Sequence, residues 1–126
     1  EAIEMVLPGG GDEIEDPAMD LVSKVYKGEN GYVVETITYG YAGNITMLIG
    51  VSNDGYVTGL QVRQMEETFG LGAEALTDWQ FLAQFLRTEG DAAVGENIDA
   101  ISGATISSKA VTNAVNSAIE AFNAIP

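Results

Sequence analysis

Four runs of β-branched and aromatic residues, separated by short breaks that contain glycine, do most to limit the folds open to this chain. The runs occupy residues 22–26, 32–39, 45–51 and 56–64. Valine, isoleucine, threonine and tyrosine favour strands, and the breaks at 27–31 and 52–55 are short enough for hairpins. In the second break, Asp54 and Gly55 suit a turn that needs positive φ. The pattern predicts four consecutive strands in an antiparallel β-meander.

The segment before Gly90 has the periodicity of a helix. A helix is predicted from about Asp78 to Arg87, and Thr77 and Gln80 have the spacing of a capping box at its start. Its aromatic residues are assigned to the hydrophobic core, where aromatics at helical spacing usually pack. They are Trp79, Phe81 and Phe85.

A second helix is predicted from Ser107 or Ser108 to Ile125, with either serine as its N-cap. Its apolar residues form one stripe at helical spacing. They are Val111, Val115, Ala118, Ile119 and Phe122. Strands followed by helices predict an α+β fold, an antiparallel meander packed with two or more helices in a single domain.

The first 20 residues differ in composition from the rest of the chain. They hold seven acidic side chains and no basic one, and Pro8 leads into three consecutive glycines. This composition is typical of a flexible, solvated linker. We expect residues 1–20 to be an acidic lead-in from a preceding anchor or domain, and residues 21–126 to form the folded domain.

Composition excludes several classes of function. With 19 acidic and 5 basic side chains, the chain has a formal charge of −14, which repels nucleic acids and anionic membranes. The absence of cysteine and histidine removes thiol nucleophiles, disulfides, imidazole metal sites and histidine-based triads. No catalytic side chain and no metal site are predicted, so any chemistry must come from a cofactor. No stretch approaches the ~20 apolar residues of a membrane span.

A phosphate group fits the segment from Asp99 to Thr105, which reads Asp-Ala-Ile-Ser-Gly-Ala-Thr directly before the last predicted helix. Free amides and the helix dipole attract a phosphate at such a place. Gly103 and Ala104 allow close approach, while Ser102 and Thr105 supply hydroxyls for hydrogen bonding or covalent attachment. The residues alone leave a second interpretation open, a glycine turn that only caps a helix.

The pattern Asp-x-x-Ser-Gly-Ala-Thr resembles the flavinylation motif of the FMN-binding domain family. That family includes one component each of the Rnf electron-transport complex and of the sodium-pumping NADH:quinone oxidoreductase, designated G and C respectively. The resemblance implies FMN joined through its phosphate to the hydroxyl of Thr105 by a separate flavin transferase that uses FAD and magnesium. It makes Asp99 part of the transferase recognition sequence, although the residue alone is equally interpreted as an exposed carboxylate. Without the transferase, we expect the chain to lack FMN.

A second resemblance lies at residues 67–72, where Glu-Thr-Phe-Gly-Leu-Gly is similar to the Glu-Thr-Pro-Gly-Leu-Gly loop beside the flavin in that family. Phe69 replaces the usual proline, which adds a backbone N–H and loosens the loop. The resemblance implies cofactor contacts here, with the leucine packed on the isoalloxazine. The implied residues are Thr68, Gly70, Leu71 and Gly72. The same loop also serves as a tight turn between a strand and a helix.

Two further features leave alternatives open. Residues 39–45 are similar to a Gly-Tyr-Gly-Gly-Pro-Ile turn of the family and are interpreted as structural, with Tyr41 or Gly43 as alternative cofactor contacts. Lys109, one turn past Thr105, either neutralises the flavin phosphate or the reduced flavin, or is simply an exposed lysine. A flavin-stacking role for Trp79 and its neighbouring phenylalanines is the alternative to their core assignment.

The resemblance predicts an electron carrier within a membrane-bound, ion-translocating complex of the Rnf type. We expect other subunits of that complex and the flavin transferase as partners, and no nucleic acid. The predicted location is the outer face of the cytoplasmic membrane, periplasmic or extracellular, through an anchor not in this chain. Two alternatives remain: the FMN module of an extracellular multidomain reductase, and a binding or structural module that works without flavin.

Overall fold

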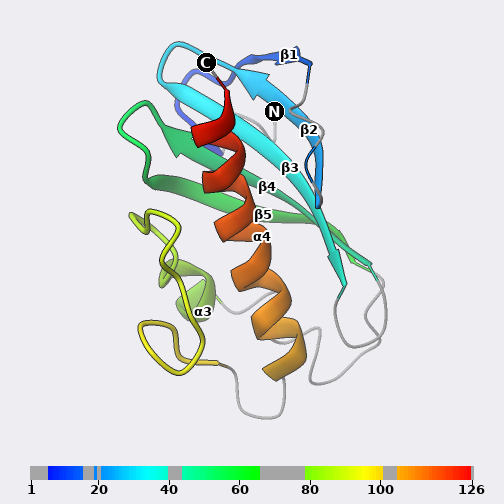
Figure 1. Cartoon of the computed structure of the whole chain (residues 1–126), viewed down its shortest axis with the longest axis vertical. Helices are drawn as coiled ribbons and strands as arrows, with labels where there is room; N and C mark the ends of the chain where they lie inside the picture. The colour runs from blue at the N-terminus through cyan, green and yellow to red at the C-terminus, as the bar shows by residue number, and fades with distance from the viewer. Residues whose placement is uncertain are drawn as a thin grey trace.

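The computed structural model describes residues 6–15, 19, 21–39, 44–65, 79–100 and 105–125. Within them, five strands form one antiparallel sheet in the order β1-β2-β3-β4-β5. The strands are β1 (Asp12–Ile14), β2 (Val22–Lys27), β3 (Gly31–Tyr39), β4 (Asn44–Ser52) and β5 (Val57–Met65). Figure 1 shows one long helix, α4 (Thr105–Ala124), lying across a face of this sheet. The predicted α+β fold with an antiparallel meander is confirmed.

The sheet follows the predicted strand pattern closely because each described hairpin has the turn chemistry that it needs. Between β4 and β5, Gly55 has a φ of 91° and donates its N–H to the carbonyl of Ser52 at 2.9 Å. The Ser52 N–H in turn donates to the carbonyl of Tyr56 at 2.9 Å. Left-handed backbone of this kind favours glycine, which is why Asp54-Gly55 ends one strand and begins the next.

The predicted apolar stripe of α4 is confirmed, since four of its five residues are buried and Phe122 is partly buried against the core. The predicted start of this helix is wrong, because α4 begins at Thr105. Ser107 and Ser108 are buried within the helix instead of capping it. Their small side chains fit the packed face of α4, so the helix continues through them. Among the described residues, no helix is long and apolar enough to cross a membrane.

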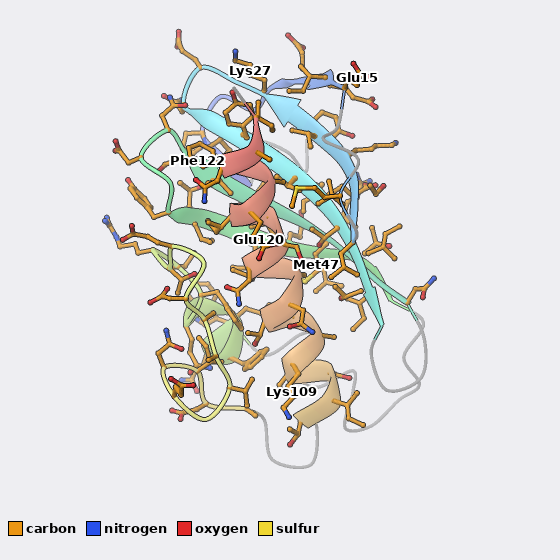
Figure 2. All side chains as sticks on the ribbon, in the orientation of Figure 1. Glu15, Lys27, Met47, Lys109, Glu120 and Phe122 are labelled. Atoms are coloured by element: carbon orange, nitrogen blue, oxygen red, sulfur yellow. The ribbon has the colours of Figure 1, made fainter. Side chains whose placement is uncertain are left out.

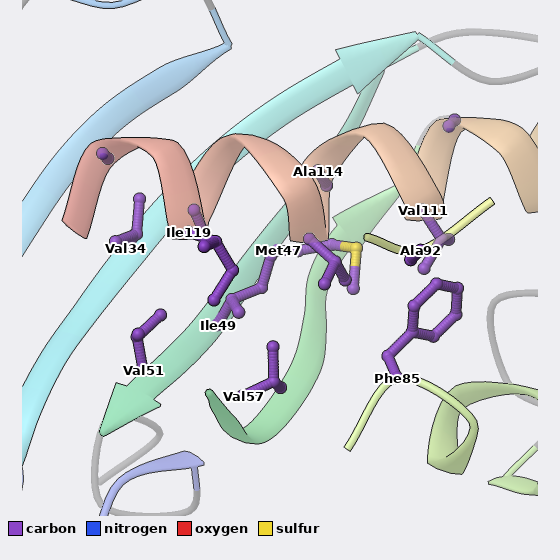
Figure 3. Packing of buried hydrophobic residues seen from close by; sticks show 14 of the residues in the cluster. Val34, Met47, Ile49, Val51, Val57, Phe85, Ala92, Val111, Ala114 and Ile119 are labelled. Atoms are coloured by element: carbon purple, nitrogen blue, oxygen red, sulfur yellow. The ribbon is translucent and has the colours of Figure 1, made fainter. Parts of the chain in front are cut away.

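The main core lies between α4 and the sheet. Figure 3 shows Met47 and Ile49 of β4 beneath Ala114 and Ile119 of α4. Phe85 closes one end of this layer beside Val111, as the same view shows. All six of these side chains are buried. Burial of such side chains, at roughly 1.5–3 kcal/mol for each large one, is the main force that holds α4 on the sheet.

The helix predicted before Gly90 is shorter than expected, since α3 spans only Trp79–Ala83. Beyond it the chain continues in tight turns, and the N–H of Phe85 donates to the carbonyl of Leu82 at 3.2 Å. Arg87 then adopts a left-handed φ of 69°, which no right-handed helix tolerates. Of the predicted capping box, Thr77 lies outside the described residues.

The prediction that three aromatic residues lie in the core is confirmed for two of them. Phe81 and Phe85 are buried and meet edge to face with ring centroids 5.4 Å apart. Trp79 is 71% exposed, so its assignment to the core is wrong. Residues four apart share a helix face, whereas Trp79 stands two residues before Phe81, roughly 200° around the helix.

The structure differs from the predicted flexible lead-in over the part that it describes. Residues 12–14 form β1, which pairs with β2. Val6 and Leu7 are buried with Val33 and Leu48 in a second, smaller cluster. The Thr58 hydroxyl donates to the carbonyl of Val6 at 2.6 Å, which anchors this segment to β5. Two buried apolar residues, strand pairing and this hydrogen bond together hold the segment on the sheet, while the domain boundary at residue 21 stays a prediction.

We predict that Phe85→Ala destabilises the fold by about 3–5 kcal/mol, because it removes a fully buried ring and leaves a cavity. Urea unfolding followed by circular dichroism measures this change. The matched control is Trp79→Ala in the adjacent helix, for which exposure predicts a change within about 0.5 kcal/mol. Equal losses in the two variants would contradict this description of the core.

We predict that Gly50→Ala releases the N-terminal segment from the sheet. A Cβ at Gly50 would overlap the carbonyl oxygen of Val6, so the two chain segments could no longer approach so closely. Limited proteolysis within residues 1–15 should become faster than in the parent chain. Gly95→Ala controls for general destabilisation, since its φ of 89° strains an alanine while nothing lies within 4 Å of the added carbon. It should leave that cleavage rate unchanged.

Candidate functional site

Two strands, β3 and β5, finish at the same end of the sheet. Ile45, at the start of β4, pairs with Thr38 of β3 on one side and with Met65 of β5 on the other. β3 and β5 therefore end side by side, at Tyr39 and Met65. Two segments that resemble parts of the family follow these strand ends in the sequence: residues 39–45, interpreted as structural, and the loop at residues 67–72, expected to contact the flavin.

The long helix begins toward this same end of the molecule. Its last turn lies at the start of β3, where the rings of Phe122 and Tyr32 meet with centroids 5.6 Å apart. α4 therefore runs opposite to β3 and begins toward the end where β3 finishes, as Figure 1 shows. The motif that ends in Thr105 thus joins α4 on the side of the molecule where both strands end.

Most of the predicted cofactor contacts lie outside the described residues. They are Ser102, Gly103, Ala104, Thr68, Gly70, Leu71, Gly72 and the alternatives Tyr41 and Gly43. The described part of the candidate site consists of Thr105, Lys109 and Asp99, together with the groups that hold them.

Thr105 is the first residue of α4 and is exposed. The first turn of a helix has backbone N–H groups without helical partners and the positive end of the helix dipole. No acidic residue stands in the first turn of α4 to offset that positive end. A hydroxyl that is exposed at such a place can carry or bind a phosphate without burial of its charge.

Lys109 is exposed and lies on the same face of α4 as Thr105, because residues four apart on a helix are neighbours. It is the single basic residue in the sequence of this helix. Figure 2 shows Lys109 near the beginning of α4, far from Lys27 at the opposite end of the molecule. The helix thus adds one mobile positive charge next to Thr105.

Asp99, at the start of the motif, is exposed at its side chain but held at its main chain. Its N–H donates to Oε1 of Gln84 at 2.7 Å, and Nε2 of Gln84 donates to its carbonyl at 3.0 Å. Nε2 also donates to the carbonyl of Phe81 at 3.2 Å. Sequence reasoning missed Gln84, because a partner 15 residues away produces no local pattern.

The loop before Asp99 is held by further side-chain amides. Asn116 of α4 accepts from the N–H of Ala92 at 3.3 Å and donates to its carbonyl at 2.8 Å. Asn97 accepts from the N–H of Ala93 at 2.8 Å within the loop. Ile98, directly before Asp99, is fully buried in the main core. The motif therefore leaves the core from a fixed point.

Comparison with protein-family models matches residues 40–120 to the FMN-binding domain. The matched region contains all of the motif from Asp99 to Thr105 and the loop at residues 67–72. It begins directly after β3 and ends within α4, so it covers every described element of the candidate site.

Several curated proteins are similar over most of this chain, and the three that follow are each the component designated G of their complex. That of the Na⁺-translocating ferredoxin:NAD⁺ oxidoreductase complex of Acetobacterium woodii is 44% identical, with 73% of this chain and 49% of that protein aligned. That of an ion-translocating oxidoreductase complex of Methanosarcina acetivorans is 39% identical over 98% of this chain and 74% of its own length. That of the proton-translocating ferredoxin:NAD⁺ oxidoreductase complex of Clostridium ljungdahlii is 42% identical, and this chain spans 51% of it.

We predict that Thr105→Ala changes the stability of the fold by no more than about 0.5 kcal/mol, because Thr105 is exposed and alanine favours helices. Thermal unfolding of the purified variant measures this. Ser108→Leu, one turn along α4, is the contrasting variant: Ser108 is fully buried, and overpacking there should cost about 1–3 kcal/mol. A large loss in Thr105→Ala would show that its hydroxyl serves the fold.

Proposed function

Because the chain belongs to the FMN-binding domain family, we propose that it is an electron-transfer domain that carries FMN through a phosphoester on Thr105. The observation that carries this proposal is the exposed hydroxyl of Thr105 at the first position of a 20-residue helix. A threonine there offers a nucleophilic oxygen beside the positive end of the helix dipole.

The residues at the start of α4 fit a phosphoester. The helix N-terminus favours the negative charge of the phosphate, and the first turn contains no carboxylate to repel it. Lys109 lies on the same helix face and can reach the phosphate oxygens as a mobile cation. We assign Lys109 to that task. Ser102, Gly103 and Ala104 are proposed as the remaining contacts of the phosphate end.

The attachment is proposed to require a separate flavin transferase. The Thr105 Oγ bonds to the phosphorus of FAD that bears the riboflavin unit, and the bond from that phosphorus to the bridging oxygen of the pyrophosphate breaks. AMP leaves, and no electrons are exchanged. The hydroxyl proton passes to a base of the transferase, since the chain has no histidine or cysteine and α4 has no acidic first-turn residue. Asp99 is proposed to belong to the sequence that the transferase recognises.

When bound, FMN supplies the redox chemistry, taking up and releasing electrons at its isoalloxazine ring. The chain holds the ring in place between electron donor and acceptor. Thr68, Gly70 and Gly72 are proposed to contact the ring edge or the phosphate, and Leu71 to pack on the face of the ring. A covalent tether suits this role because a carrier outside the cytoplasm could not replace a lost cofactor.

We further propose that the chain works as part of the G component of an ion-translocating redox complex. The names of relatives that are 39–44% identical support this assignment. The other subunits of the complex are then its electron donor and acceptor. The proposed location is the outer face of the cytoplasmic membrane. In that arrangement an anchor outside residues 1–126 holds the domain there.

Coexpression with a flavin transferase tests the attachment. Intact-mass analysis should show the mass of FMN less one water added to the parent chain and to Thr105→Ser, which keeps a hydroxyl. Thr105→Ala should show no adduct, although it folds. An adduct on Thr105→Ala, or none on the parent chain, would contradict the proposal. Ser107→Ala is the matched control, since Ser107 is buried two residues along α4, and it should keep the adduct.

A further inference from the structure

The side chain of Gln84 uses its hydrogen-bonding groups on main-chain atoms of two separate segments. Its Oε1 and Nε2 bond to the N–H and the carbonyl of Asp99, at 2.7 and 3.0 Å. The second hydrogen of Nε2 donates to the carbonyl of Phe81, within α3. A carboxamide that matches both groups of one residue fixes the position and the orientation of that peptide, as a neighbouring strand would.

Gln84 itself stands on a rigid base. Phe81, three residues before it, and Phe85, directly after it, are both buried in the main core. Their rings meet edge to face at an interplanar angle of 82°. The N–H of Gln84 also donates to the carbonyl of Phe81 at 3.2 Å. The backbone of Gln84 thus lies between two core residues, and its side chain links this part of the chain to Asp99.

The motif therefore begins and ends at fixed points. Gln84 holds Asp99, and α4 holds Thr105 as its first residue. Five residues separate the two in the sequence. A short stretch of chain fixed at both ends has far fewer conformations than one fixed at a single end.

We propose that Gln84 is a positioning residue for the FMN-bearing segment, which limits the orientations open to a group attached at Thr105. This inference rests on the proposed attachment of FMN to Thr105. Gln84 does not touch the reacting atoms. It acts through the main chain of Asp99, and it requires an amide, because a carboxylate could not donate to the carbonyls of Asp99 and Phe81.

Two matched substitutions separate this role from a general loosening of the loop. Gln84→Ala removes both side-chain hydrogen bonds to Asp99. Asn116→Ala removes another donor–acceptor pair, from Asn116 to Ala92, earlier in the same loop; that pair is part-buried, whereas the Gln84 pair is exposed. Loss of a pair of hydrogen bonds raises the population of the locally open state about tenfold or more. Only the Gln84 substitution frees the start of the motif.

The first readout does not need the cofactor. The chain has no cysteine, so Thr105→Cys introduces a single thiol for a nitroxide spin label at the attachment position. We expect a restricted spectrum in the parent background, a mobile component in Gln84→Ala and none in Asn116→Ala. Amide hydrogen exchange at Asp99 should become about tenfold faster in Gln84→Ala alone.

The second readout uses the FMN-loaded chain with Thr105 intact. Fluorescence anisotropy decay of the flavin should gain a fast component in Gln84→Ala and keep its parent form in Asn116→Ala. Gln84→Glu keeps the size of the side chain but loses its donors, so its spectra should change as those of Gln84→Ala do. If the alanine variant does not fold, Gln84→Glu tests the role of Gln84 in its place. Parent-like spectra in the Gln84 variants, or equal changes in Asn116→Ala, would overturn the inference. Absence of FMN from the parent chain after coexpression with a flavin transferase would overturn the proposed function, while the spin-label comparison would still decide the role of Gln84.

Discussion

The burial of one face of α4 against the sheet is the interaction on which the rest of this structure depends. The small residues of the helix, such as Ala114 and Ala118, let it lie close to the strands, while Ile119 and Val111 fill the space beside Met47. Because the helix is held along most of its length, its first residue is held as well. Thr105 and Lys109 are thus attached to the layer that contains the main core, although as exposed side chains they contribute little to its stability.

The segment from Thr88 to Ala100 shows how a loop with almost no regular structure is held in place. One isolated bridge, between Val94 and Ile98, is the sole strand-like pairing within it. Side-chain amides of glutamine and asparagine take over the role that neighbouring strands play in the sheet, because each can donate to and accept from the main chain. Buried Ala92 and Ile98 add apolar anchors within this segment. Hydrogen bonds within this loop, such as those of Asn97, and hydrogen bonds from α4 and from the turn after α3 therefore hold it together.

Sequence reasoning predicted the sheet and the stripe of α4 because both depend on periodicity and on local turn chemistry, as at Gly55. It failed where tertiary contacts decide. The exposure of Trp79 depends on which side of a short helix packs against the core. The burial of Val6 depends on its packing against Val33 and Leu48 of the sheet. Gln84 has no feature that marks it in the sequence, since its task is set by residues far along the chain. The motif singled out Thr105 as a candidate residue. The helical pattern did not predict that Thr105 is the first residue of α4.

The hydrogen bonds between the Gln84 side chain and the main chain of Asp99 involve no charged group. An amide does not titrate near neutral pH, and its hydrogen bonds are screened by salt far less than an exposed ion pair would be. In a chain with a formal charge of −14, every charged contact shifts with ionic strength and with the charge of whatever approaches. A neutral contact keeps the geometry of the motif independent of those changes. Electrostatic conditions can then alter how the domain meets its surroundings without altering how Asp99 is held.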